Sequence, residues 1–219
     1  MTIRAVMAGV SLLVAAVSAP VFAEGRLAQL YAPRAPEGSA FIRVLQAGEK
    51  SLSVQVGRNA PQKLEAGTRA SAYNVVESGK SVELRIGDAV VGSLNPPAGS
   101  YQSVLLDNGK LVVLNDQSAG DDALKAELRF YNLVSDCPTA ALAVENGPAL
   151  FTDVAVNTSQ ARAINPVKAS LSASCVMANS QTLELPPLQP GDHYALFLTG
   201  SASQPTLHGE LSRTAPFTR

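Results

Sequence analysis

The chain has 219 residues, with 17 lysines and arginines against 18 aspartates and glutamates, so its formal net charge is −1. A sequence this close to neutral, without a basic stripe, does not have the positive surface that steers nucleic acids or other polyanions to a protein. We therefore do not expect nucleic acid to be a partner. Tryptophan is absent and aromatic residues make up only 5% of the chain, which leaves little material for the flat aromatic platforms of sugar-binding clefts.

Residues 1–23 have the composition of a cleavable export signal. Arg4 gives a short basic start, an apolar run follows over residues 5–17, and small residues lead up to Ala23. The apolar run is too short to cross a hydrocarbon layer of about 30 Å, which disfavours a membrane anchor. We therefore expect cleavage after Ala23 and a soluble exported protein that does not span the membrane once mature, with one or two domains.

The stretch Tyr31–Val44 opens the first folded element. Pro33 and Pro36 fix their own φ angles and bias the preceding residues away from the helical region, so the first half of the stretch is predicted to be extended. Its second half is predicted to be the first strand of a domain. A related strand opening recurs about 86 residues later, at residues 127–132. The recurrence predicts two tandem β-domains.

Residues 24–118 are predicted to form the first of these domains. Residues 51–56 and 81–86 alternate apolar and polar side chains, which is the pattern of strands with one buried face. Asn108 and Gly109 lie between two apolar runs and predict a two-residue hairpin loop, because a type I′ turn needs positive φ at both positions. Short strands separated by turns predict an antiparallel β-sandwich.

Residues 119–219 repeat this plan after a linker at residues 115–124. Residues 167–175 alternate apolar and small polar side chains. A double proline and a glycine lead into an apolar strand both within residues 94–106 and within residues 185–198. The predicted fold class is therefore all-β, with two tandem antiparallel β-sandwich domains of similar plan.

Both cysteines, Cys137 and Cys175, lie in the second predicted domain. In an oxidising compartment, a lone pair of cysteines within one domain is most simply a disulfide. Closing a loop of this length contributes about 3–4 kcal/mol in the chain-entropy model. A catalytic or metal-binding thiolate is the weaker alternative, because neither cysteine has a nearby histidine and no Cys-x-x-Cys motif is present.

Candidate catalytic groups are scarce. His193 and His208 are the only histidines. His208 has the strand phase of its polar neighbours and is predicted to be exposed, whereas His193 follows Asp192, whose side chain would point to the opposite strand face. No Gly-x-Ser-x-Gly motif, His-x-x-x-His motif or EF-hand loop is present. We therefore expect no catalytic residues, no metal and no cofactor.

The two strand openings also carry a family resemblance. The pattern Tyr-x-Pro-x-Ala-Pro-x-Gly-Ser-Ala-Phe runs from Tyr31 to Phe41 after the export signal, and Arg-Phe-Tyr-Asn-Leu occupies residues 129–133. With this layout the mature chain resembles the AlgF family of alginate O-acetylation proteins. The resemblance implies a periplasmic, non-catalytic adaptor for O-acetylation during exopolysaccharide biosynthesis, with periplasmic alginate O-acetyltransferase proteins as its partners.

Two other functions stay open. The sandwiches could bind carbohydrate and present mannuronate-rich alginate to the enzymes, or the protein could be an enzyme component that carries an acetyl group on a serine, a tyrosine or His193. A sandwich fold supports either function, so the fold class alone does not decide between them.

Partner-binding candidates are Tyr31 and Arg34, because tyrosine and arginine are over-represented among interface hot spots. Tyr31 packing against its own domain is the simpler alternative. Exposed sheet edges are also candidate docking surfaces, since an incoming strand can add main-chain hydrogen bonds there. Arg43 and Arg129 hold matching positions in the two repeats and are predicted to lie on solvated strand faces.

Overall fold

The computed structural model describes residues 35–120, 122–176 and 178–217. These residues form strands joined by turns and irregular segments, and none of them belongs to a helix long and apolar enough to cross a membrane. The predicted export signal at residues 1–23 and the partner-binding candidates Tyr31 and Arg34 lie outside the described residues.

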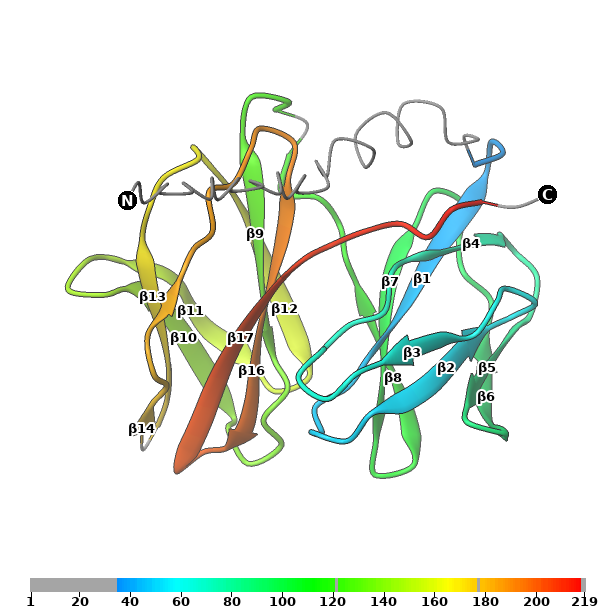
Figure 1. Cartoon of the computed structure of the whole chain (residues 1–219), viewed down its shortest axis with the longest axis horizontal. Helices are drawn as coiled ribbons and strands as arrows, with labels where there is room; N and C mark the ends of the chain where they lie inside the picture. The colour runs from blue at the N-terminus through cyan, green and yellow to red at the C-terminus, as the bar shows by residue number, and fades with distance from the viewer. Residues whose placement is uncertain (1–34, 121, 177, 218–219) are drawn as a thin grey trace, which may run out of the picture. The chain divides into compact units, whose positions relative to one another are not determined.

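The first eight strands form two four-stranded sheets, with strand orders β4-β1-β7-β8 and β3-β2-β5-β6. All neighbours are antiparallel except β1 and β7, which run parallel. The strands are drawn in blue to green in Figure 1 and are β1 (Ser39–Leu45), β2 (Leu52–Val56), β3 (Gln62–Leu64), β4 (Asn74–Glu77), β5 (Val82–Ile86), β6 (Ala89–Leu94), β7 (Tyr101–Asp107) and β8 (Lys110–Asn115).

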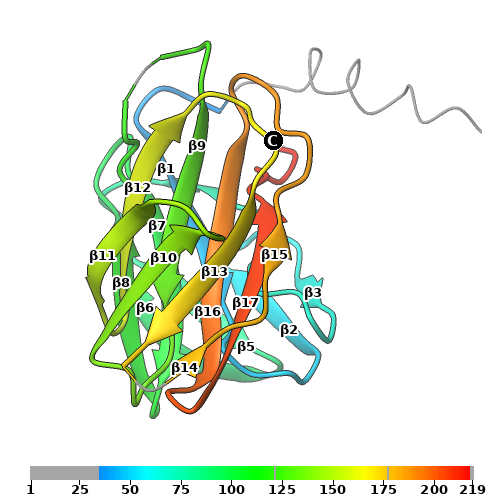
Figure 2. The same ribbon diagram turned by 90° about the vertical axis from the view of Figure 1, so that its left-hand side faces the viewer.

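The remaining nine strands form two further sheets of the same kind, with orders β12-β9-β16-β17 and β11-β10-β13-β14, and β15 also pairs with β13. Again one pair, β9 with β16, is parallel. In Figure 2 the sheet with β10 and β13 lies in front of the sheet with β9 and β16. The strands are β9 (Ala126–Asn132), β10 (Thr139–Val144), β11 (Ala149–Ala155), β12 (Thr158–Ile164), β13 (Ser170–Cys175), β14 (Ala178–Asn179), β15 (Leu183–Glu184), β16 (His193–Ser201) and β17 (Gln204–Leu211).

Each half encloses its own apolar core between its two sheets, as alternating strands require. The first core includes Ile42, Val54 and Leu84, and the second includes Phe130, Leu142 and Leu196, all at most 2% exposed. The prediction of two tandem all-β sandwiches is confirmed, and the one parallel strand pair in each half is the feature that the alternation did not indicate.

The predicted hairpin is also confirmed. Strand β7 ends at Asp107 and β8 begins at Lys110, and the two loop residues have positive φ, 48° at Asn108 and 78° at Gly109. The connection between the halves runs from β8 to β9 and contains most of the predicted linker. We propose that the boundary between the two domains falls between residues 118 and 119.

A third apolar cluster joins the two halves, which together form one compact unit. We call this cluster the seam. It lies between the outer faces of the β1-β7-β8 sheet and the β9-β16 sheet, so each of these sheets is covered on both faces. The seam consists of Leu45, Leu105, Leu114, Tyr131, Leu133, Ala195 and Phe197.

Candidate functional site

A buried arginine lies beside the seam. Arg43 in β1 is only 1% exposed, and its guanidinium donates three hydrogen bonds. Nε donates to Ser103 Oγ (2.7 Å), Nη1 to Ser212 Oγ (3.0 Å) and Nη2 to Tyr131 Oη (2.6 Å). The predicted solvated position of Arg43 is therefore wrong, because the second half covers the polar face of β1.

Asp116 is the counter-ion of Arg43. Its carboxylate lies 3.9 Å from Arg43 Nε and accepts hydrogen bonds from Tyr73 Oη (2.7 Å), Ser103 Oγ (2.5 Å) and Tyr131 Oη (2.5 Å). Burial raises the pKa of Tyr131 to about 12, against the opposing charge of Arg43. Burial also raises the pKa of Tyr73, so both phenols stay protonated and donate. We call these five residues the Arg43 network.

The second half supplies an equivalent buried arginine. Arg129 is 7% exposed, and its guanidinium donates to Glu127 Oε1 (2.9 Å) and to the carbonyl oxygen of Gln117. The predicted solvated position is wrong here too, because Arg129 lies on the face of β9 that the first half covers. The two arginines at matching repeat positions therefore face each other's domain rather than solvent.

Both halves contribute to a cavity of about 470 Å³ above this network. Strands β7, β9 and β16 contribute lining residues, and the segments that follow β8 and β17 contribute most of the others. Its lining residues are Tyr73, Tyr101, Asp116, Ser118, Gly120, Asp122, Ala123, Glu127, Arg129, His193, Tyr194, Ser212, Arg213 and Thr214. The cavity exists only while the halves are docked, and we take it as the candidate site.

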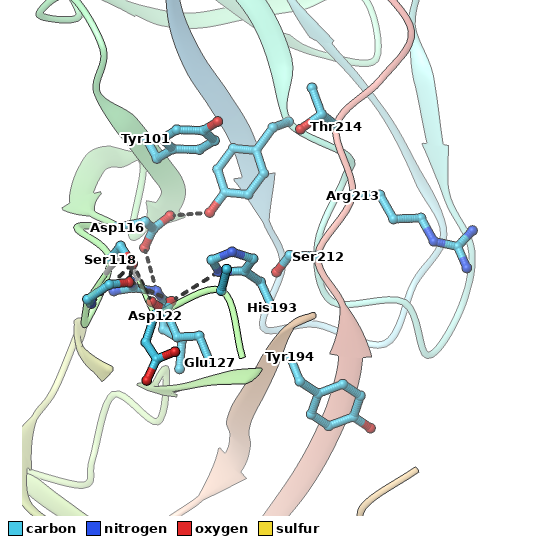
Figure 3. A pocket seen from close by; sticks show the side chains of 14 residues that line it. Tyr101, Asp116, Ser118, Asp122, Glu127, His193, Tyr194, Ser212, Arg213 and Thr214 are labelled. Carbon is cyan, nitrogen blue, oxygen red and sulfur yellow. Dashed lines mark hydrogen bonds and ion pairs between the residues drawn. The ribbon is translucent and has the colours of Figure 1, made fainter. Parts of the chain in front are cut away.

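His193 and Glu127 form a pair inside this cavity. They stand opposite each other in the parallel pairing of β9 with β16, and His193 Nδ1 lies 3.5 Å from Glu127 Oε1. In Figure 3 the imidazole points toward Asp116 and Ser118, whereas the guanidinium of Arg213 points away from them. Sequence reasoning considered only the adjacent Asp192 and missed Glu127, which the parallel register brings to His193.

Glu127 should make the stability of the protein dependent on acid pH. Burial disfavours its ionisation, but hydrogen bonds from His193 and Ala119 N and the charge of Arg129 together lower its pKa from 4.5 to about 2. Because folding lowers this pKa, the carboxylate stabilises the fold above pH 4.5, and this contribution is lost as the pH falls toward 2.

We expect the free energy of unfolding of Glu127→Gln, measured by urea titration at several pH values, to fall less between pH 5 and pH 2 than that of the wild type. Glu83→Gln, which changes an exposed ion pair with Arg85, is the matched control and should keep the wild-type drop. An equal drop in the free energy of unfolding for Glu127→Gln and the wild type would contradict the assignment of this pH dependence to Glu127.

The second histidine is not in this cavity. His208 lies on β17 opposite Phe197 and is half-buried, so its predicted exposure is wrong. Burial and the nearby charge of Arg69 lower its pKa. Its environment is that of a neutral strand residue at the border of the two halves.

Four hydroxyl groups in or beside the site donate to carboxylates rather than to imidazoles. Ser103, Tyr73 and Tyr131 donate to Asp116, and Ser118 donates to Glu127 Oε2 (3.1 Å). Within the described ranges, no serine, threonine or tyrosine hydroxyl makes a hydrogen bond to either histidine, and no group of three or more His, Cys, Asp or Glu residues could hold a metal ion.

The two cysteines are joined in the second half. Cys137 follows β9, Cys175 ends β13, and their disulfide spans a Cα–Cα distance of 5.8 Å. Both residues belong to the second core and are at most 7% exposed. The bridge therefore ties the connection between β9 and β10 to the end of β13 and lies outside the cavity.

Comparison with known proteins places the chain in a family. The family model described as "Alginate O-acetyl transferase AlgF" matches residues 9–194. The alginate biosynthesis protein AlgF of Azotobacter vinelandii is 29% identical over 181 residues, which cover 81% of this chain and 80% of that protein. Its counterpart in Pseudomonas aeruginosa is 28% identical over 175 residues, covering 80% and 79%.

Among solved structures, the C-terminal domain of AlgF from P. aeruginosa is 26% identical to this chain, with a TM-score of 0.35. The match covers 40% of this chain and 98% of that domain. The N-terminal domain of the same protein is 24% identical, with a TM-score of 0.32, and the match covers 38% of this chain and all of that domain. The family model spans most of the chain, as the resemblance of the two strand openings implied. The chain belongs to the AlgF family.

Proposed function

We propose that the protein is a non-catalytic, periplasmic accessory protein of alginate O-acetylation that acts through contacts with the acetylation proteins. Membership of the AlgF family, whose curated members are named alginate biosynthesis proteins, supports the pathway. Cleavage of residues 1–23 would deliver the protein to the periplasm. The proposed partners are the periplasmic alginate O-acetyltransferase proteins.

One observation carries the non-catalytic part of this proposal. The hydroxyls of Tyr73, Ser103 and Tyr131 are buried and all donate to the same carboxylate, that of Asp116. A nucleophilic hydroxyl needs a base that accepts its proton, usually an imidazole that a third group orients. The imidazole of His193 lies 3.5 Å from Glu127 Oε1, but no hydroxyl among the described residues forms a hydrogen bond to it, so the pair lacks a nucleophile there.

The carbohydrate-binding alternative is disfavoured by charge. Alginate is a polyanion, and the cavity wall includes the carboxylates of Asp116, Asp122 and Glu127. Arg129 is buried against Glu127, and Arg213 points away from the centre of the cavity (Figure 3). Like charges in such a cleft oppose the approach of a mannuronate chain.

The test is a binding experiment with the full mature protein. We expect it to bind purified periplasmic alginate O-acetyltransferases in biolayer interferometry, to show no saturable binding of defined mannuronate oligomers, and to transfer no acetyl group to polymannuronate on its own. Arg34→Ala should weaken protein binding about tenfold if Arg34 is a hot spot, which corresponds to about 1.4 kcal/mol.

Other outcomes of these experiments would support a different function or a different binding surface. Saturable binding of the oligomers without protein binding would replace the adaptor by a carbohydrate-presenting module. Acetyl transfer that His193→Ala abolishes would make the protein an enzyme component. Unchanged protein binding by Arg34→Ala would remove that residue from the partner-binding surface.

A further inference from the structure

Strand β8 is an edge strand that lacks the usual protection against pairing with another chain. It pairs with β7 on one side only. Natural sheets protect such edges with charges, prolines, bulges, caps or very short strands, because free main-chain groups otherwise recruit foreign strands. Between its first residue, Lys110, and its last, Asn115, β8 has only leucines and valines, and its pairing with β7 has no register shift.

The other long edges of the described sheets each carry a protecting feature. Strand β17 contains Pro205, β12 has Arg162 in its interior, and β11 and β6 have irregular register with their neighbours. In β4, Asn59 Nδ2 donates to the carbonyl oxygen of Val75 (3.2 Å) and so caps its outer edge. Strands β3, β14 and β15 have three residues or fewer. By this comparison β8 is the unprotected edge.

The hairpin register identifies the free groups of β8. In a two-residue hairpin the residues that flank the loop form a hydrogen-bonded pair, and such pairs then alternate along the ladder. Asp107 and Lys110 flank this loop, and the phase agrees with the hydrogen bond from Asp116 N to the carbonyl oxygen of Tyr101 (2.8 Å). The N–H and C=O groups of Leu111 and Val113 therefore point outward, and no described residue bonds to them.

The side chains at this edge offer an apolar border. Val113 is 42% exposed, although Val104, its cross-strand partner, is only 1% exposed. Leu111 on the same face packs so close to Gly92 of β6 that an added Cβ at Gly92 would overlap Leu111 Cδ1. The first core is therefore closed at Leu111 and open at Val113, where an apolar side chain of an added strand could extend it.

Lys110 gives the edge a charge preference. It is exposed at the start of β8 and forms no ion pair with any residue that the structure describes. An acidic side chain opposite it in an added strand would be a favourable cross-strand pair, whereas a basic one would be unfavourable.

From these observations we propose that the β8 edge receives an extended segment of an alginate O-acetyltransferase, which adds a strand to the β4-β1-β7-β8 sheet. The segment carries small apolar residues at alternate positions and an acidic residue opposite Lys110. Main-chain hydrogen bonds from Leu111 and Val113 supply its affinity, and the open border at Val113 supplies its side-chain preference. This inference rests on the proposed adaptor function and specifies its docking surface.

Two variants of Val113 test the proposal. Val113→Pro removes an outward N–H group and leaves the hydrogen bonds to β7 in place, because proline is tolerated where the N–H faces solvent. Val113→Lys keeps the N–H group but places a charge at the open border. The matched control is Val90→Lys, which changes an exposed valine on β6. Thermal denaturation establishes that each variant is folded.

We expect both Val113 variants to weaken binding of the purified acetyltransferases at least tenfold in biolayer interferometry, and Val90→Lys to bind as the wild type does. Wild-type affinity in both folded Val113 variants would overturn the β8 assignment and leave the adaptor function standing. Absence of binding by the wild type would reject both proposals. A wild-type dimer in sedimentation velocity that Val113→Lys makes monomeric would identify a second copy of the chain as the occupant and overturn the proposal.

Discussion

Replacing Arg43 with methionine is expected to lower the free energy of unfolding by about 3 kcal/mol, the lower end of the range for breaking a buried ion pair, because Arg129 Nε remains 4.0 Å from the carboxylate of Asp116. Asp116 would keep its three hydroxyl donors and Arg129 but lose one of its two buried cations, and Tyr131 and Ser212 would lose the guanidinium as a donor. The measurement is urea denaturation of the mature protein near neutral pH, followed by far-ultraviolet circular dichroism.

Arg85→Met is the matched control for this experiment. Arg85 forms an ion pair with Glu83 on the exposed face of β5, so its loss should cost less than about 1 kcal/mol. The double variant Arg43→Met/Asp116→Asn should lose less stability than the two single variants added together, because it removes both charges of one buried pair. A loss for Arg43→Met as small as that for Arg85→Met would show that the network contributes little.

The features that the sequence predicted are local ones. Alternation in stretches such as residues 51–56 and 81–86 follows from the two-residue period of a strand, and the Asn108-Gly109 loop follows from the φ values that only such residues adopt readily. The repeated strand openings indicated two domains for the same reason, since each was recognisable within about ten residues. Such signals do not depend on the rest of the chain.

The features that were missed depend on contacts between the two halves. Arg43 and Arg129 alternate with apolar residues as any solvated strand arginine would, and only the opposing sheet makes their polar face an interior one. The pairing of His193 with Glu127 likewise requires the parallel register of β9 and β16. A buried polar network is the place where reasoning from local pattern is expected to fail, because its residues violate the usual rule for burial.

The seam also sets what the candidate site can do. Tyr101 and Asp116 come from the first half, and Glu127 and His193 from the second, so the cavity depends on docking of both halves. The β8 edge, in contrast, belongs to the first half alone. A variant that loosens the seam, such as Arg43→Met, should therefore disturb the cavity more than it disturbs strand addition at β8.

Removing the disulfide is expected to lower the free energy of unfolding by about 3–4 kcal/mol, because the bond closes a loop with a sequence separation of 38 residues and so restricts the unfolded chain. The Cys137→Ala/Cys175→Ala variant tests this in urea denaturation without leaving a free thiol. Titration of the denatured, unreduced wild type should find no reactive thiol, since the two cysteines are the only ones in the chain.

Addition of a reductant is the internal control, because it should destabilise the wild type and leave the double variant unchanged. Equal stability of the oxidised wild type and the double variant would mean that packing of the second core restricts this loop without the bond. Since Cys137 and Cys175 lie in that core and outside the seam, the loss should fall on the second sandwich. Binding through β8 should persist wherever the first half remains folded, which separates the structural role of the disulfide from the proposed docking surface.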